Sequence, residues 1–266
     1  MSTSDRLLRV LGLFSIERPQ WSVEEAAAEL GLAVSTAYRY VRTLCEADLL
    51  TSFANGRYVL GPAIIKFDRQ MRLLDPLISV SAPVMKQLAP ILPANCLLLL
   101  CRLYRDQVMC VHQEYAVMPT FAVSYERGRP MPLSRGAASK VILANMPGRF
   151  LKAFHARHAE ELRERLGADY PEVRGRLREI RSQGVHVTQS ELDPGMMGIA
   201  APLFEPGGSV VGSISIVLPA RLGTPNVVER ASTLIRAAGA QIGVSLAGLA
   251  GAAAQPAAAG AEIVQT

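Results

Sequence analysis

The sequence predicts an α+β chain of two domains, with three short helices and a hairpin in the first domain and mixed strands and helices in the second. Three observations support this fold class. Apolar residues in the first 45 positions recur at the i, i+3, i+4 spacing of a helix face. The period then changes around an Asn-Gly pair. Beyond residue 80, apolar runs of strand length alternate with helical segments, and 266 residues suffice for two domains.

Each of the three N-terminal helices has one apolar face. In the first helix this face is formed by Leu7, Val10, Leu11 and Phe14, and Arg18-Pro19-Gln20 interrupts the segment. The second helix begins at Ser22 with a Ser22/Glu25 capping box and ends at Gly31, a position for a left-handed residue. The third begins at Ser35, and its apolar face consists of Ala37, Tyr40, Val41 and Leu44.

A hairpin follows the three helices. Residues 49–53 and 57–60 flank Asn55-Gly56, a pair that tolerates the positive φ of a type I′ turn, and Gly61-Pro62 closes the hairpin. Three helices followed by a hairpin form a winged helix-turn-helix, which we assign to residues 1–61. Residues 62–80 are predicted to form a linker helix.

Residues 81–250 are predicted to form the second domain. Strands are expected at 96–103, 108–112, 198–203 and 210–218, with Arg105-Asp106-Gln107 as a turn. Helices are expected at 137–144, at 171–183 before Gly184, and at roughly 226–249. Residues 251–266 begin with an Ala/Gly-rich stretch without apolar periodicity and are predicted to be a disordered tail.

Composition excludes several classes of protein. The N-terminus lacks the basic and apolar regions of a signal peptide, and no run approaches the ~18 strongly apolar residues of a spanning helix. The four cysteines contain no C-x-x-C pair, which suits a reducing compartment. We therefore expect a soluble cytoplasmic protein without a membrane partner. The net charge of +5 does not indicate DNA binding, because residues 1–80 contain nine basic and nine acidic residues.

The polar face of the third helix carries the functional signal. Its positions at i, i+3, i+4 and i+7 are Ser35, Tyr38, Arg39 and Arg42, and Thr36 and Thr43 flank them. Residues 31–45 contain no acid, as a helix that reads base edges between phosphates requires. Arg57, beside the hairpin tip, could reach a phosphate or the minor groove. The alternative is a small helical domain with a solvated polar face.

Longer segments resemble a known family. In the N-terminal half these are Arg9-Val-Leu-Gly-Leu-Phe, Glu25-Ala-Ala-Ala-Glu-Leu-Gly-Leu, Ser35-Thr-Ala-Tyr-Arg-Tyr-Val-Arg-Thr-Leu and Gly56-Arg-Tyr-Val-Leu-Gly-Pro. They resemble the DNA-binding half of the IclR family of bacterial transcriptional regulators. Residues 133–144, 177–184, 198–203 and 210–216 follow the order and spacing of that family's GAF-like effector-binding domain, an α/β domain with a mainly antiparallel sheet. The resemblance covers about residues 5–245.

This resemblance implies a ligand-responsive regulator. Its partners would be double-stranded operator DNA with repeated half-sites, a small organic acid effector, and further copies of the chain in a homodimer or homotetramer. A change in orientation through the 62–80 linker would connect the effector to the DNA. Neither a cofactor nor a catalytic residue is implied.

The resemblance also implies a pocket between a helix and the sheet. Its positions here are Leu133, Gly136, Ala137, Thr188, Gly198 and Ser215. Small residues that open a helix at 136–138 expose amides that can hold a carboxylate, and the two hydroxyls can add donors. Close packing is the alternative for the glycine and alanine at the helix start, and a bond to a neighbouring strand is the alternative for Ser215.

The pocket positions also depart from the family pattern. Many family members have a Cys where this chain has Gly198 and an acidic residue where it has Thr188. Val217 stands where the family pattern has a second hydroxyl on the last strand, and Ser139 stands in place of the Gly before Lys140. These replacements predict a roomier, less polar cavity for a bulkier carboxylate such as an aromatic acid.

Other functions have weaker support. The chain lacks a G-x-S-x-G elbow, since Gly212-Ser213-Ile214 lies in a strand pattern, and it lacks phosphate-binding glycine loops. Two clusters could hold a metal, but a charged helix face and buried small side chains explain them better: His155, His158 and Glu161, and Cys101, Cys110 and His112. We therefore expect no metal. The remaining alternatives are a ligand-independent DNA-binding or oligomerisation protein and a small-molecule enzyme.

Overall fold

The structure is a computed structural model that describes residues 2–254. The chain divides into two compact units between Asp75 and Pro76. The linker predicted over 62–80 is therefore not one helix. Helix α4 (Ala63–Leu74) ends before Asp75, whose backbone is extended, and α5 (Pro76–Leu88) begins at the next residue. Proline disfavours helical backbone at the residue before it, so the Asp75-Pro76 step breaks the helix.

The first unit contains the three predicted helices, α1 (Thr3–Leu11), α2 (Val23–Leu30) and α3 (Val34–Glu46). The Ser22 hydroxyl accepts from the Glu25 amide at 3.2 Å, and Gly31 ends α2 with a φ of 63°, as predicted. The expected apolar face of α3 is buried. Helix α1 ends before Phe14, so Phe14 packs on this core from the following loop.

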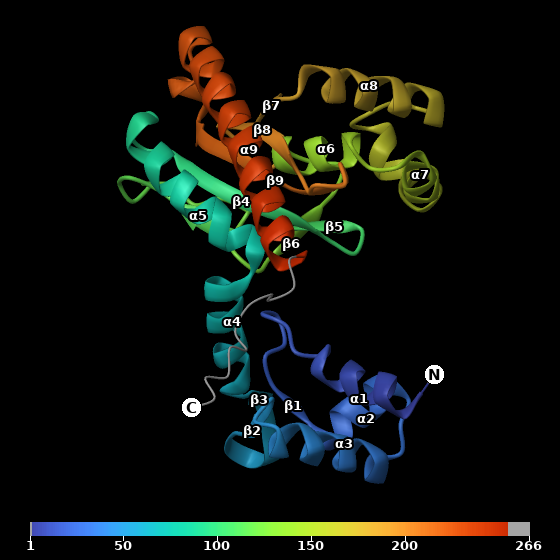
Figure 1. The fold of residues 1–266 in the computed structure, drawn as a ribbon. Coiled ribbons are helices and arrows are strands. Elements are labelled where there is room, and N and C mark those ends of the chain that lie inside the picture. The colour runs from blue at the N-terminus through green and yellow to red at the C-terminus, as the bar shows by residue number, and fades with distance from the viewer. Residues whose placement is uncertain (1, 255–266) are drawn as a thin grey trace, which may run out of the picture. The chain divides into compact units, whose positions relative to one another are not determined.

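The predicted hairpin follows, with β2 (Leu50–Ser52) antiparallel to β3 (Arg57–Leu60) (Figure 1). A short 3-10 turn, η1 (Ala54–Gly56), joins the strands. Asn55 and Gly56 both have positive φ, and the Arg57 amide donates to the Ala54 carbonyl, as a type I′ turn requires. A further strand, β1 (Trp21–Ser22), pairs with β3. Its two residues are too few to produce a period in the sequence.

The second unit contains a sheet with strand order β6-β5-β4-β9-β8-β7, in which all neighbours are antiparallel. Its strands are β4 (Leu97–Tyr104), β5 (Gln107–Glu114), β6 (Pro130–Pro132), β7 (His186–Gln189), β8 (Met196–Phe204) and β9 (Val210–Pro219). The four strands expected from apolar runs are confirmed. Arg105-Asp106 forms the turn between β4 and β5, and Gln107 already belongs to β5.

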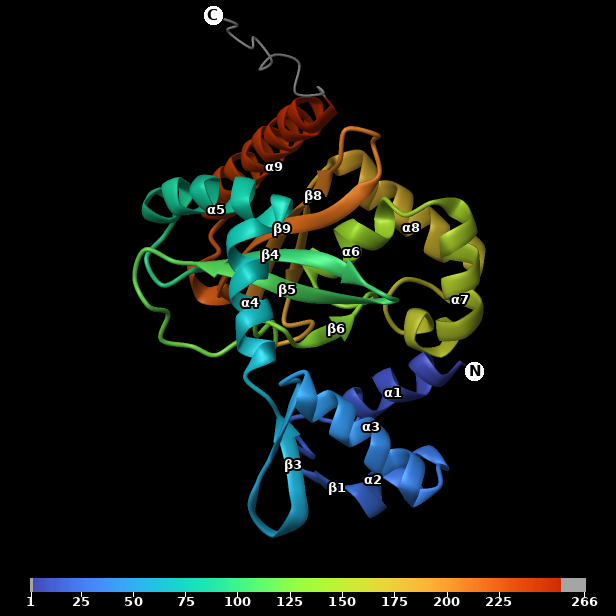
Figure 2. The same cartoon turned by 60° about the horizontal axis from the view of Figure 1, so that its bottom comes forward.

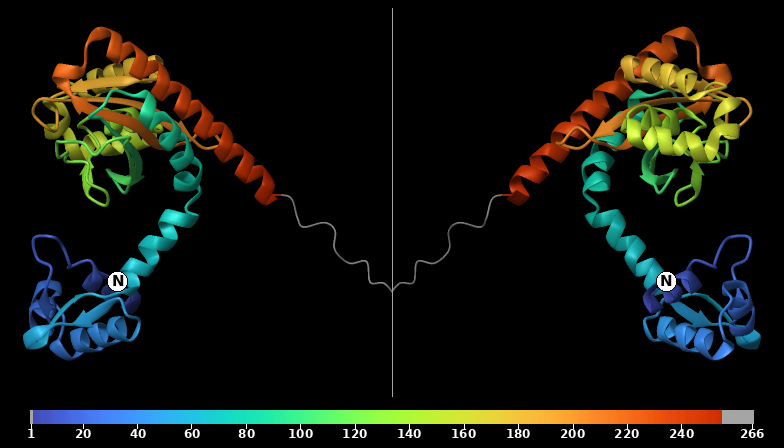
Figure 3. Two further views of the ribbon diagram at one scale, coloured as in Figure 1. Left: turned by 90° about the vertical axis from the view of Figure 1, so that its left-hand side faces the viewer. Right: turned by 90° about the vertical axis from the view of Figure 1, so that its right-hand side faces the viewer.

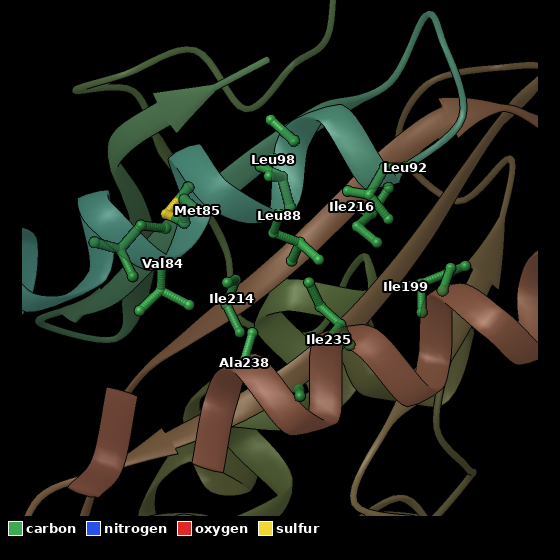
Figure 4. Close-up of a cluster of buried hydrophobic side chains, with 14 of the residues drawn as sticks. Val84, Met85, Leu88, Leu92, Leu98, Ile199, Ile214, Ile216, Ile235 and Ala238 are labelled. Carbon is green, nitrogen blue, oxygen red and sulfur yellow. The ribbon is translucent and has the colours of Figure 1, made fainter. Parts of the chain in front are cut away.

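Helices cover both faces of this sheet (Figure 2). Helices α5 and α9 (Pro225–Ala254) pack on one face, and Figure 4 shows part of that core, where Leu88, Ile214 and Ile235 lie together. The opposite face is covered by α6 (Ala137–Ala144), α7 (Gly148–Arg163) and α8 (Tyr170–Gln183). Short 3-10 turns lie at η2 (Ala89–Ile91) and η3 (Ala220–Leu222).

Helix α9 continues to Ala254, so the first four residues of the predicted tail are helical and the rest, 255–266, lie outside the described residues. Within residues 2–254, Pro225–Gly251 is the one helix whose length and composition would allow a membrane crossing, a property that core helices of soluble proteins share. Its N-terminal half packs Ala231, Ile235 and Ala238 against the sheet, and its C-terminal half extends past the sheet (Figure 3).

Candidate functional site

Helix α3 presents the predicted polar face to solvent. Ser35, Tyr38, Arg39, Arg42 and Thr43 are exposed, and Thr36 is half-buried. The aromatic side chain of Tyr38 lies on this face and is 58% exposed. Two of these side chains donate hydrogen bonds within the helix. Arg42 Nε donates to Glu46 Oε1 at 2.9 Å, and Thr43 Oγ1 donates to the Arg39 carbonyl at 3.0 Å.

Arg57 is held by α2 and is not free beside the hairpin tip. Its guanidinium donates to Glu25 Oε1 at 2.9 Å and to Glu25 Oε2 at 3.2 Å. Arg18 also lies 3.2 Å from Glu25 Oε2. The Ser22 amide and the Arg57 guanidinium lower the pKa of Glu25. Glu25 therefore joins the second helix to the hairpin, and a contact of Arg57 with DNA stays a prediction.

A cavity lies where α6, the loop between β7 and β8, and strands β8 and β9 meet. Its empty volume is about 390 Å³, which includes space open to solvent. It is lined by Tyr125, Gly136, Ala137, Ala138, Thr188, Glu191, Leu192, Asp193, Met196, Met197, Gly198, Ser215 and Val217. Of the six predicted pocket residues, all but Leu133 line it, and Leu133 is buried in the core beneath.

Four further lining residues, Tyr125 and the loop residues Glu191, Leu192 and Asp193, were not predicted from the sequence. These positions lie in irregular segments, where no periodicity marks which side chains point inward. Gly136 carries the one local signal. Its φ is 81°, and a Cβ there would lie 2.6 Å from Leu192 Cδ1, so the loop can pack on this position only if it is glycine.

The first amides of α6 are already occupied. The Gly136 amide donates to Glu191 Oε2 at 3.0 Å, and the Ala137 amide donates to Thr188 Oγ1 at 3.1 Å. The expectation that both are open to a ligand is therefore wrong for this conformation, because two internal acceptors take the place of the ligand. Among the described residues, no acceptor contacts the amide of Ala138, which also lines the cavity.

Glu191 is paired with a buried cation. Lys140 Nζ donates to Glu191 Oε1 at 2.6 Å, and Lys140 is only 5% exposed. Burial raises the pKa of Glu191, but the Lys140 ammonium and the Gly136 amide outweigh it and hold the pKa below its usual value. Burial and the Lys140 charge lower the pKa of His186 to about 4. Glu191 therefore carries its negative charge at neutral pH.

Two buried hydroxyls differ in their partners. Tyr125 Oη lies 2.6 Å from Ser139 Oγ, and burial raises the pKa of this tyrosine well above its usual range. Ser215 is 1% exposed and lines the cavity, and its Oγ has no hydrogen-bond partner among the described residues. An unpaired buried hydroxyl is costly, so Ser215 favours a polar occupant of the cavity.

The clusters considered for metal binding are not brought together as metal sites. His155 packs on Tyr170 with ring centroids 5.4 Å apart, whereas His158 contacts Asp106 at 3.2 Å and Glu161 at 3.5 Å. In the part of the chain that the structure describes, no three His, Cys, Asp or Glu residues are placed to hold a metal ion.

The cysteine and serine alternatives have structural roles here. Cys101 lies opposite Cys110 across β4 and β5, and the hydrogen bond that the Cys101 thiol donates to Cys110, together with burial, raises the pKa of Cys101. Ser213 Oγ, on β9, donates to the Ala138 carbonyl at 3.0 Å and so ties α6 to the sheet. These side chains are explained by packing.

Comparison with known proteins places both units. Residues 3–52 match the model of the IclR helix-turn-helix domain, and residues 74–244 match that of the bacterial transcriptional regulator IclR C-terminal domain. The HTH-type transcriptional repressor AllR of Klebsiella pneumoniae is 25% identical over 227 residues, 85% of this chain and 82% of that protein. The HTH-type transcriptional regulator KipR of Bacillus subtilis is 25% identical over 213 residues, 79% of this chain and 82% of that protein.

Solved structures share the fold. A Silicibacter IclR transcriptional regulator superposes with a TM-score of 0.76 at 21% identity, covering 92% of this chain and 96% of the other. An IclR homologue from Microbacterium hydrocarbonoxydans, complexed with 4-hydroxybenzoate, superposes with a TM-score of 0.72 at 19% identity, covering 92% and 99%. Because the two domain models match in order and the second alone spans more than half of the sequence, the chain belongs to the IclR family of bacterial transcriptional regulators.

Proposed function

We propose that this chain binds an operator through α3 and responds to a small aromatic carboxylate in the cavity of its second unit. The observation that carries the proposal is the exposed polar face of α3, on which no acid precedes Glu46 at the end of the helix. Residues 1–61 would bind double-stranded DNA, and residues 81–250 would bind the effector and hold copies of the chain together. Because the target is genomic DNA, we infer a cytoplasmic location.

On this proposal, α3 lies in the major groove. Arg39 and Arg42 have the donors that guanine edges and phosphates accept, and Ser35 and Thr36 at the helix start lie where a recognition helix meets the bases. Arg42 can leave Glu46 at little cost in free energy, since a largely exposed ion pair contributes little to stability. Arg57 would exchange Glu25 for a phosphate only at a greater cost, because it is held at two oxygens.

We further propose that the active form is a homodimer or homotetramer. Helix α4 exposes Ile65, Phe67, Met71 and Leu74, a larger apolar surface than a solvated helix normally shows. A second copy is the partner that a two-fold operator requires. Paired copies would place α3 in successive major grooves, about 34 Å apart.

The cavity supports the proposed class of effector. Leu192, Met196 and Val217 provide apolar surface for a ring, and the Ala138 amide and Ser215 hydroxyl provide donors for oxygen atoms. A relative points the same way: the IclR homologue from Microbacterium hydrocarbonoxydans was solved with 4-hydroxybenzoate.

A mobility-shift experiment tests this function. The DNA upstream of the chain's own gene is titrated with the wild type, with Arg39→Ala, and with Arg176→Ala on α8 as the control. We expect Arg39→Ala to weaken specific binding by about 1–3 kcal/mol and Arg176→Ala to leave it unchanged. If neither this fragment nor selection from genomic DNA gives specific binding, the regulator proposal fails and the enzyme alternative returns. If no acid stabilises the folded chain, the ligand-independent alternative replaces the effector proposal.

A further inference from the structure

The cavity holds a carboxylate of its own. Glu191 occupies two donors that a carboxylate ligand would seek, the Gly136 amide at 3.0 Å and the Lys140 ammonium at 2.6 Å. A carboxylate ligand and the Glu191 side chain would therefore compete for the same anion site. We propose that Glu191 is an internal competitor, which a carboxylate effector displaces from Lys140 and Gly136, and that its release frees the loop between β7 and β8. This inference rests on the effector function proposed above.

Because of Lys140, Glu191 is more easily replaced by another carboxylate than by a neutral ligand. It is nearly fully buried, and a buried ammonium without an anion is strongly unfavourable. A neutral ligand cannot take the place of Glu191, because it would leave that ammonium unpaired. An anionic ligand keeps the charge balanced at Lys140, while Glu191, whose side chain is already 23% exposed, moves to solvent. The cavity should therefore bind carboxylates in preference to neutral ligands, because only a carboxylate can replace Glu191 beside Lys140.

The contacts of the loop show what Glu191 restrains. Its backbone carbonyl accepts from Arg135 Nη2 at 3.2 Å, and Leu192 packs on Gly136. At the other end, Asp193 accepts from the Ser124 amide at 3.0 Å and from the Ser124 hydroxyl at 2.5 Å. Release of Glu191 would free the first half of the loop, and the Asp193–Ser124 contact would hold the second half as a pivot.

Glu191 should then lower the affinity of the cavity for a carboxylate ligand. If the ligand binds only when Glu191 has left, the apparent dissociation constant equals the intrinsic one divided by the fraction of molecules in which Glu191 is released. Glutamine at position 191 has the size of glutamate and keeps a side-chain oxygen that accepts hydrogen bonds, but it has no charge. The Lys140 ammonium is then left without an anionic partner. We expect Glu191→Gln to bind aromatic carboxylates about 10-fold more tightly.

Isothermal titration calorimetry tests the competition. The probes are 4-hydroxybenzoate and its neutral analogue 4-hydroxybenzamide, titrated into full-length wild type, Glu191→Gln, and Glu164→Gln as a control on an exposed carboxylate far from the cavity. Support is a gain of about 10-fold for the acid in Glu191→Gln only, with the amide unaffected. Equal or weaker binding of the acid by Glu191→Gln would overturn the proposal.

Hydrogen exchange provides a readout that does not depend on affinity. We expect 4-hydroxybenzoate to speed exchange of the Glu191 and Leu192 amides in the wild type, and we expect ligand-free Glu191→Gln to exchange fast already. Protection of this loop by the acid would contradict release. If neither protein binds the acid while the wild type still shifts its operator, the competition is refuted and the regulator function stands. If the operator shift is also absent, the proposed function itself fails.

Discussion

Replacing Lys140 with methionine tests the structural role of the buried ion pair. Methionine keeps the length and apolar volume of the lysine stem and removes the charge. Lys140 is 5% exposed and donates to Glu191 at 2.6 Å, so the substitution leaves Glu191 with the Gly136 amide and partial solvent. The change therefore isolates the contribution of the ammonium to the fold of the second unit.

The size of the effect follows from burial. Removing one partner of a fully buried pair costs about 3–5 kcal/mol, because a charge stays behind unpaired. Glu191 is 23% exposed and keeps one amide donor, so we expect a loss of about 2–3 kcal/mol in the free energy of unfolding. Lys152→Met on the exposed side of α7 should change it by less than about 0.5 kcal/mol. The double variant Lys140→Met/Glu191→Leu should recover most of the loss, since an apolar pair replaces an ionic one.

Urea denaturation can assign the loss to the correct unit. The single tryptophan, Trp21, lies in the first unit, so its fluorescence reports that unit, whereas far-ultraviolet circular dichroism reports both. We expect Lys140→Met to lower the circular dichroism midpoint while the Trp21 transition stays in place. A midpoint equal to that of Lys152→Met, or a double variant no more stable than Lys140→Met, would refute the reasoning.

Three further substitutions test separate features. Ser215→Ala removes a buried hydroxyl that has no partner, so the free energy of unfolding should not fall, whereas calorimetry should show about 10-fold weaker binding of 4-hydroxybenzoate; unchanged binding would remove Ser215 from the site. Gly212→Ala puts a Cβ 2.2 Å from the Cys101 carbonyl oxygen and should cost about 3 kcal/mol in urea denaturation, whereas Gly207→Ala, with open space around it, should cost little. His186 has a pKa of about 4 when folded and about 6.5 when unfolded, so the unfolded chain binds more protons between these values and stability falls as the pH drops from 7 to 4. For a fully buried group this difference in pKa corresponds to about 3 kcal/mol in the free energy of unfolding, and the partial exposure of His186 reduces our expectation to about 1–2 kcal/mol. His186→Gln should flatten the curve of stability against pH between these values. An unchanged curve would contradict the assignment of this pH dependence to His186.

Local patterns predicted the elements of the first unit because their causes are local. The capping box at Ser22 and the positive φ of Asn55 and Gly56 each arise within four residues. The helix faces follow from a period of 3.6 residues. The break at Asp75 was also readable, since the proline that follows restricts it, but the apolar composition of residues 62–80 concealed the interruption.

The contacts that define the site are distant in sequence and leave no local pattern. Lys140 and Glu191 are 51 residues apart, and Arg57 and Glu25 are 32 apart. A charged residue in a loop has the same signature whether it is solvated or holds a buried partner. Family resemblance located the cavity through its strands and helix, and it did not reveal that Glu191 fills the anion site. For that reason only the structure could show that the first amides of α6 are occupied.

The most direct test of the central claim measures operator affinity with and without the effector. A labelled operator fragment, found by selection from genomic DNA, is titrated with the chain, and fluorescence anisotropy is recorded with and without an aromatic acid that raises the chain's melting temperature. Coupling between two sites in one protein commonly changes affinity by about 5–150-fold. We predict a change of at least about 5-fold for the wild type, and for Ser215→Ala the same response shifted to about 10-fold higher acid concentrations. An operator affinity that is the same with and without saturating acid would contradict the claim that the cavity controls the DNA-reading helix.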